Sequence, residues 1–116
     1  MKIETRRIYD DPHGKGFRVL VDRLWPRGLR KDEVDFDLWL KDLAPSDPLR
    51  KWFGHEPAKW DEFKKRYFAE LEGKQDQIRR LTDAAKDKTT VLLYGAKDTE
   101  HNQAVALKEY LESRRP

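Results

Sequence analysis

The sequence VLVDRLWPRG, residues 19–28, is the most informative part of the chain, because it joins a strand-like apolar run to a charged turn that contains proline. Three consecutive apolar residues, 19–21, are typical of a strand that is covered on both faces of a sheet. The segment VLLYGAKDTEHN, residues 91–102, has the same order of apolar strand, glycine and polar cluster. Ligands of open α/β sheets bind outside the carboxyl ends of the strands, so these two segments predict one shared pocket.

The composition indicates one small globular domain. Of the 116 residues, 41% are charged and 11% are aromatic, including four tryptophans. This length suffices for a single core and the aromatic content argues against disorder, so we expect one domain over residues 1–116. The 25 Lys and Arg exceed the 22 Asp and Glu by only three, which predicts weak long-range attraction to nucleic acid.

Features that the sequence lacks narrow its chemistry and its location. The chain contains no cysteine, which excludes disulfides, thiol nucleophiles and cysteine-ligated zinc. The first residues lack the apolar stretch of a signal peptide, and nowhere do eighteen apolar residues run together. We therefore expect a soluble, cytoplasmic protein with no membrane partner.

The spacing of apolar residues predicts an α/β protein with a small, mostly parallel sheet flanked by helices. We expect strands at residues 2–8, 17–24 and 89–94. Helices are expected at residues 49–53, 57–73 and 99–113, and residues 78–85 form either a further helix or a bent continuation of the one before it. Residues 36–41 fit either a short strand or a helical turn. The loop at residues 10–16 is rich in turn formers and is a candidate lid.

Two arginines flank the pair Trp25-Pro26 in the first segment. The proline holds Trp25 in an extended conformation and stiffens the turn, which would fix the separation between Arg23 and Arg27. Guanidinium groups suit carboxylate or phosphate oxygens. The alternative is a structural role, in which Arg23 pairs with Asp22 and Trp25 fills the core.

The second segment would place a helix start at the same edge of the sheet. Asp98 or Thr99 would cap a helix that begins near residue 99, and its free N–H groups would attract an anion. His101, in the first turn, would stay neutral and act as a base or a hydrogen-bond partner. Lys97 and Tyr94 could face the ligand, although loop exposure and packing explain them equally well.

No cofactor or metal motif is present. The glycines at positions 14 and 16 lack the spacing of a phosphate-binding loop, and no dinucleotide-binding glycine pattern opens a helix. His13, His55 and His101 fall on different predicted elements, so we predict no metal site.

Four motifs resemble those of the YeaO-like family of bacterial and archaeal proteins, which is described as a domain of unknown function. The resemblance spans nearly the whole chain and rests on residues 21–28 (VDRLWPRG), 39–46 (WLKDLAPS), 52–55 (WFGH) and 92–104 (LLYGAKDTEHNQA). It implies relatives but no established reaction. It also draws attention to His55, which Gly54 could turn toward the pocket.

The resemblance also limits what can be carried over from more distant relatives. Those relatives have a cysteine at the position of Tyr94 and a Cys-His-Arg run at the positions of residues 102–104. This chain has none of these residues. A thiol-dependent or metal-dependent role in those relatives therefore does not extend to this chain.

The leading hypothesis is a protein that binds a small anionic ligand, phosphorylated or nucleotide-like, at the carboxyl edge of the sheet. The candidate ligand-binding residues are Arg23, Trp25, Arg27, Tyr94, Lys97 and Asn102. If the protein also catalyses hydrolysis or group transfer, the candidate acid–base residues are Asp22, Asp98, His55 and His101.

Two alternatives remain open. One is a non-catalytic module that binds nucleic acid or protein through arginine and tryptophan side chains, although the charge balance does not favour nucleic acid. The other is an internal salt-bridge network that serves the fold alone.

Overall fold

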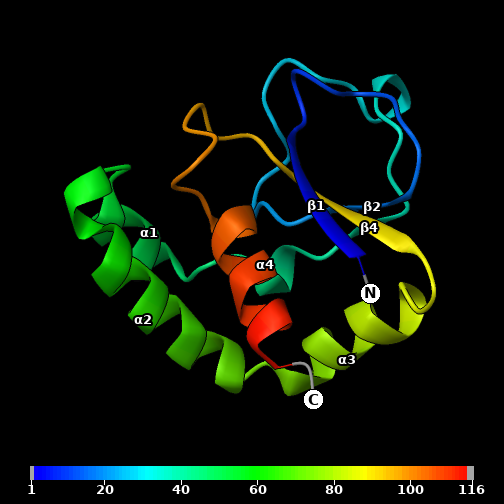
Figure 1. Cartoon of the computed structure of the whole chain (residues 1–116). Coiled ribbons are helices and arrows are strands. Elements are labelled where there is room, and N and C mark those ends of the chain that lie inside the picture. The colour runs from blue at the N-terminus through cyan, green and yellow to red at the C-terminus, as the bar shows by residue number, and fades with distance from the viewer. Residues whose placement is uncertain (1, 115–116) are drawn as a thin grey trace.

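A computed structural model describes residues 2–114, in which four strands form one parallel sheet (Figure 1). The strands lie in the order β1-β4-β2-β3, and every neighbouring pair is parallel. Their bounds are β1 (Lys2–Arg7), β2 (Phe17–Leu20), β3 (Leu38–Trp39) and β4 (Thr89–Tyr94). The predicted α/β class with a mostly parallel sheet is confirmed.

The two central strands carry the most apolar sequences. Val19, Leu20 and Val21 have no exposed surface, which confirms that this run is covered on both faces. The predicted strand at residues 17–24 is too long, because β2 ends at Leu20 and Leu24 is 74% exposed. Backbone pairing ends where Val21 N donates to Leu93 O (3.1 Å). The side chain of the next residue, Asp22, then accepts a hydrogen bond from the backbone just beyond β4.

The four helices are α1 (Asp47–Phe53), α2 (Trp60–Glu72), α3 (Gln75–Ala84) and α4 (Gln103–Ser113). The first begins two residues before the predicted range of 49–53, because Ser46 Oγ accepts a hydrogen bond from Leu49 N (3.3 Å), and Gly54 ends it in the left-handed conformation. A short 3-10 turn at Pro57–Lys59 precedes α2. None of the helices in residues 2–114 combines the length and the apolar character that crossing a membrane requires.

The prediction that the last helix begins at residue 99 is wrong. Asp98 Oδ1 instead accepts hydrogen bonds from Glu100 N (2.9 Å) and His101 N (3.0 Å), which hold residues 98–101 in a turn. Asn102 caps α4, because its Oδ1 accepts from Val105 N (3.0 Å). His101 therefore precedes the helix and does not lie in its first turn.

Helices cover one face of the sheet, and the long connection between β2 and β3 covers the other (Figure 1). On the helical face, the strand residues Val19 and Leu92 pack in one core with Phe63 and Leu107. The opposite face has a smaller core of five buried residues with aromatic side chains around it. Its buried members are Ile8, Leu20, Val34, Val91 and Leu93, and Trp25, Leu29, Phe36 and Trp39 pack against them.

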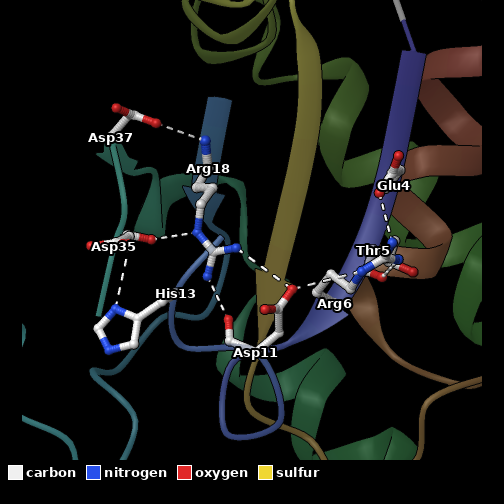
Figure 2. A network of polar contacts seen from close by, with 8 residues as sticks. All are labelled: Glu4, Thr5, Arg6, Asp11, His13, Arg18, Asp35 and Asp37. Atoms are coloured by element: carbon white, nitrogen blue, oxygen red, sulfur yellow. Dashed lines mark hydrogen bonds and ion pairs between the residues drawn. The ribbon is translucent and has the colours of Figure 1, made fainter. Parts of the chain in front are cut away.

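One buried arginine holds the loop at residues 10–16 in place (Figure 2). Arg18 is only 2% exposed, and its guanidinium group donates to Asp11 O (2.5 Å) and Asp35 O (2.6 Å). Its backbone N donates to Asp37 Oδ2 (2.8 Å), and the Asp11 carboxylate lies 3.7 Å from both Arg18 Nη1 and Arg6 Nε. This network joins the loop to the segment that precedes β3.

We expect Arg18→Met to lower the free energy of unfolding by about 3 kcal/mol, because two carbonyl oxygens would lose a charged donor in a buried place. Arg6→Met is the matched control, since Arg6 belongs to the same network but is half exposed, and it should cost less than about 1 kcal/mol. Urea unfolding measures both. Equal losses in the two variants would contradict a special role for the buried arginine.

Candidate functional site

A side chain joins the ends of the two central strands. Asp22 Oδ2, just beyond β2, accepts a hydrogen bond from Gly95 N (2.9 Å), just beyond β4. The other carboxylate oxygen accepts from the side-chain amide of Gln103 at the start of α4. Arg7 adds the end of β1, because its Nε donates to Ala96 O (3.0 Å). The two polar segments therefore meet at one edge of the sheet.

Glycine is required at position 95 for this contact. A Cβ atom there would lie 2.8 Å from Asp22 Oδ2, which is closer than real Cβ atoms approach. It would also approach Tyr9 and Pro26 at 3.7 and 3.9 Å, which are ordinary contacts. The carboxylate can thus reach the backbone only because residue 95 has no side chain.

A cavity of about 320 Å³ opens at this edge, where the strand ends, α1, α2 and the start of α4 supply its lining. Its volume is near the lower end of the range for small-molecule sites. Its apolar lining consists of Leu24, Ala44, Pro45, Phe53, Phe63 and Ala96. Its charged and polar lining consists of Asp22, Arg23, Asp47, Arg50, His55, His101, Asn102 and Gln103.

Asp22 is a largely buried carboxyl group without a cation beside it. Burial raises its pKa to about 6, and the hydrogen bonds from Gly95 and Gln103 oppose the rise. Among residues 2–114, no Lys, Arg or His lies within ion-pair distance of it, so Arg23 does not neutralise it. The carboxylate therefore keeps unused acceptor capacity in the wall of the cavity.

Arg23 and Arg50 bring two guanidinium groups to the same cavity. Both flank Asp47, whose Oδ1 lies 3.5 Å from Arg23 Nε and 3.6 Å from Arg50 Nη2. Their side chains are 44% and 54% exposed, so they lie at the mouth of the cavity and can turn toward a ligand. One carboxylate shared by two guanidinium groups leaves a local excess of positive charge there.

His101 is oriented by the carboxylate of Asp98. Its Nδ1 lies 2.9 Å from Asp98 Oδ2, and its ring meets the Trp60 ring edge-on with the centroids 5.3 Å apart. The Glu100 N–H and the His101 side chain hold the pKa of Asp98 below its usual value. With Nδ1 engaged in this way, Nε2 is the nitrogen that remains for a ligand.

His55 enters the lining through an unusual backbone. Gly54 and His55 have φ angles of 55° and 58°, so two consecutive residues are left-handed after α1. This conformation is costly for a residue with a Cβ atom, and such strain is often found at ligand sites. The turn places His55 in the cavity wall, with its ring centroid 6.3 Å from that of Phe53.

Four of the ten residues singled out from the sequence lie elsewhere. Trp25 packs on Phe36 and Trp39 in the smaller core, and its Nε1 donates to Leu29 O (2.5 Å). Tyr94 is buried in the main core. Arg27 and Lys97 are exposed and do not line the cavity. The other six are brought together. Five line the cavity, namely Asp22, Arg23, His55, His101 and Asn102, and Asp98 contacts one of them, His101.

The structure adds residues that the sequence did not single out. Arg50 lies one helical turn before Phe53, a core residue, on the same face of α1. A charged residue on this face is the sequence feature that could have indicated a role for Arg50 in the site. Gln103 gave no such signal, because only the fold brings it to Asp22.

The loop at residues 10–16, a candidate lid, contributes nothing to the lining. In the part of the chain that the structure describes, no group of three acidic, His or Cys residues could hold a metal ion.

The sequence of this chain is similar to a protein family and to several known proteins. The family described as "Inactive DUF488-N3 subclade" matches residues 2–115. The "Uncharacterized protein YeaO" of Escherichia coli (strain K12) is 42% identical over 114 residues, which are 97% of this chain and 99% of that protein. The "Uncharacterized protein Rv3073c" of Mycobacterium tuberculosis is 44% identical over 84 residues, 70% of this chain and 71% of that protein. No solved structure matches.

We expect Gly95→Ala to lower the free energy of unfolding by about 1–3 kcal/mol, because the new methyl group displaces the Asp22 carboxylate. Gly73→Ala is the matched control, since a Cβ there meets only Glu70 O at 3.5 Å. Chemical denaturation of both variants measures the difference. The explanation for Gly95 is wrong if the two substitutions have the same effect.

The raised pKa of Asp22 predicts a pH dependence of stability. The folded state holds this proton more tightly than the unfolded state, where the pKa is near 3.8, so the contribution of Asp22 to stability falls as the pH rises from about 4 to 6. The stability of the wild type relative to Asp22→Asn should therefore fall by about 1–3 kcal/mol between pH 4 and pH 7. Urea titrations at several pH values check this, and a difference that stays constant or rises with pH would contradict it.

Proposed function

Because the chain belongs to the YeaO-like DUF488 family, in the subclade described as inactive, we propose that it binds a small anionic ligand at the carboxyl edge of the sheet without converting it. The observation that carries the proposal is the cavity of about 320 Å³ with Arg23 and Arg50 at its mouth. Guanidinium groups are the usual partners of carboxylate and phosphate groups.

The lining supports binding better than catalysis. Its described members include no serine, threonine or cysteine, so it offers no hydroxyl or thiol nucleophile. Asp98 is committed to its own turn and to His101, which orients that imidazole as a hydrogen-bond partner for the ligand. The family description points the same way. Catalysis by Asp22 and His101 as acid and base is the alternative that a turnover assay decides.

The rival function, a module that binds nucleic acid through arginine and tryptophan, has less support. It needs an aromatic side chain beside the arginines on an open surface. Trp25 instead packs on Phe36 and Trp39 against the smaller core, with its indole N–H already bonded to Leu29 O. A concave site of limited volume suits a small molecule better.

We expect Arg50→Ala and Arg23→Ala each to weaken binding of ribose 5-phosphate by about tenfold or more, because each removes a charge-assisted hydrogen bond to the anion. Isothermal titration calorimetry measures the dissociation constants. Arg80→Ala is the matched control, since Arg80 is exposed on α3 and does not line the cavity.

The same samples test turnover. Phosphorus NMR of the protein with ribose 5-phosphate over several hours should show the ester intact. Release of inorganic phosphate that Asp22→Asn abolishes would overturn the non-catalytic proposal. Absence of binding, or equal weakening by Arg80→Ala, would overturn the site itself.

A further inference from the structure

The inner wall of the cavity contains an acceptor that the protein leaves partly unused. A carboxylate has about four lone-pair positions, and Asp22 uses one on each oxygen, toward Gly95 N and the Gln103 amide. No cation of residues 2–114 forms an ion pair with it. Buried carboxylates are ordinarily paired or fully hydrogen-bonded, so a ligand that supplies donors would complete the set.

Gln103 places a donor beside this acceptor. One N–H of its side-chain amide is given to Asp22, and the second N–H and the carbonyl oxygen remain. Asp22 and Gln103 thus present a carboxylate and an amide donor side by side in the cavity lining. A ligand edge that matches them has a carbonyl oxygen next to two N–H donors.

The apolar part of the cavity lining favours a flat, uncharged group. Phe53 and Phe63 are buried and stacked, with ring centroids 4.4 Å apart, and both line the cavity together with Pro45. An ammonium group would bring a second charge into this apolar surrounding, which is costly. Neutral N–H groups on an aromatic ring satisfy Asp22 without that cost.

The positions of the charged residues determine the direction in which a ligand would bind in the cavity. Asp22 and Gln103 are half-buried or deeper, whereas Arg23 and Arg50 are exposed at the mouth. A ligand therefore enters with its donor edge inward and leaves its anionic group outside, near the guanidinium groups. About 320 Å³ suits one ring system and its sugar better than an oligonucleotide.

Resting on the proposed function, we infer that the cavity takes a guanine nucleotide, with the base between Asp22 and the phenylalanine wall and the phosphate at Arg23 and Arg50. Guanine presents its ring N–H and its 2-amino group to the carboxylate, and its neighbouring carbonyl oxygen to Gln103. Adenine offers only one donor at this edge, and hypoxanthine lacks the 2-amino group. Xanthine carries an oxygen in place of that amino group.

The test compares five ligands by calorimetry at pH 7.5: GMP, IMP, AMP, XMP and ribose 5-phosphate. We expect the wild type to bind GMP at least tenfold more tightly than each of the others, because a donor lost opposite a buried carboxylate leaves that group unpaired. Asp22→Asn should lose at least tenfold in GMP affinity and prefer XMP, since an asparagine amide can donate to the xanthine oxygen. The comparison of GMP with IMP needs no variant and stands if Asp22→Asn does not fold.

The outcomes separate this inference from the proposed function. If ribose 5-phosphate or AMP binds the wild type as tightly as GMP, and Arg50→Ala still weakens binding, the guanine inference is wrong and anion binding stands. If none of the five ligands binds, both are wrong. An unchanged order of GMP and XMP in a folded Asp22→Asn protein would also overturn the role given to this carboxylate.

Discussion

The hydrogen bond from Gly95 N to the Asp22 carboxylate is the contact on which the site depends, because it fixes the end of β2 against the end of β4. Parallel strands bring these ends to one edge, and the backbone hydrogen bond from Val21 N to Leu93 O fixes their spacing, but the sheet does not fix the course of the chain beyond them. The carboxylate holds the two segments that follow the strands together. It also reaches the start of α4 through Gln103, so a single side chain positions two strand ends and a helix around the cavity.

This contact carries an energetic cost that a ligand could relieve. The surrounding residues remove Asp22 from water, which raises the pKa of its carboxyl group, and the hydrogen bonds from Gly95 and Gln103 oppose this rise only in part. Arg18 is also a buried charged residue, but its hydrogen-bonding groups have partners within the protein. It is satisfied by backbone carbonyls and a carboxylate and serves the fold, whereas Asp22 keeps acceptor capacity toward a cavity.

Much of this arrangement could be predicted from residue order alone. The uninterrupted apolar runs at residues 19–21 and 91–93 identified the central strands, because this signal is local. The start of α4 was misplaced because the side chain of Asp98 competes with the helix for backbone N–H groups, and the sequence alone does not show which of the two prevails.

Trp25 was assigned to the ligand because nothing local reveals that residues 22–37 fold back over the sheet. Arg50 and Gln103 join the site only through tertiary structure, which periodicity does not encode.

If the cavity at the joined strand ends is the ligand site, the N–H group of Gly95 should report binding. We would titrate the ¹⁵N-labelled protein with GMP and follow the backbone and side-chain amides by NMR. We expect saturable shifts for the Gly95 amide, the Gln103 side-chain amide and the backbone of residues 22 and 23. Shifts confined to another surface, such as the hollow beside Arg6 and Lys15, would contradict it.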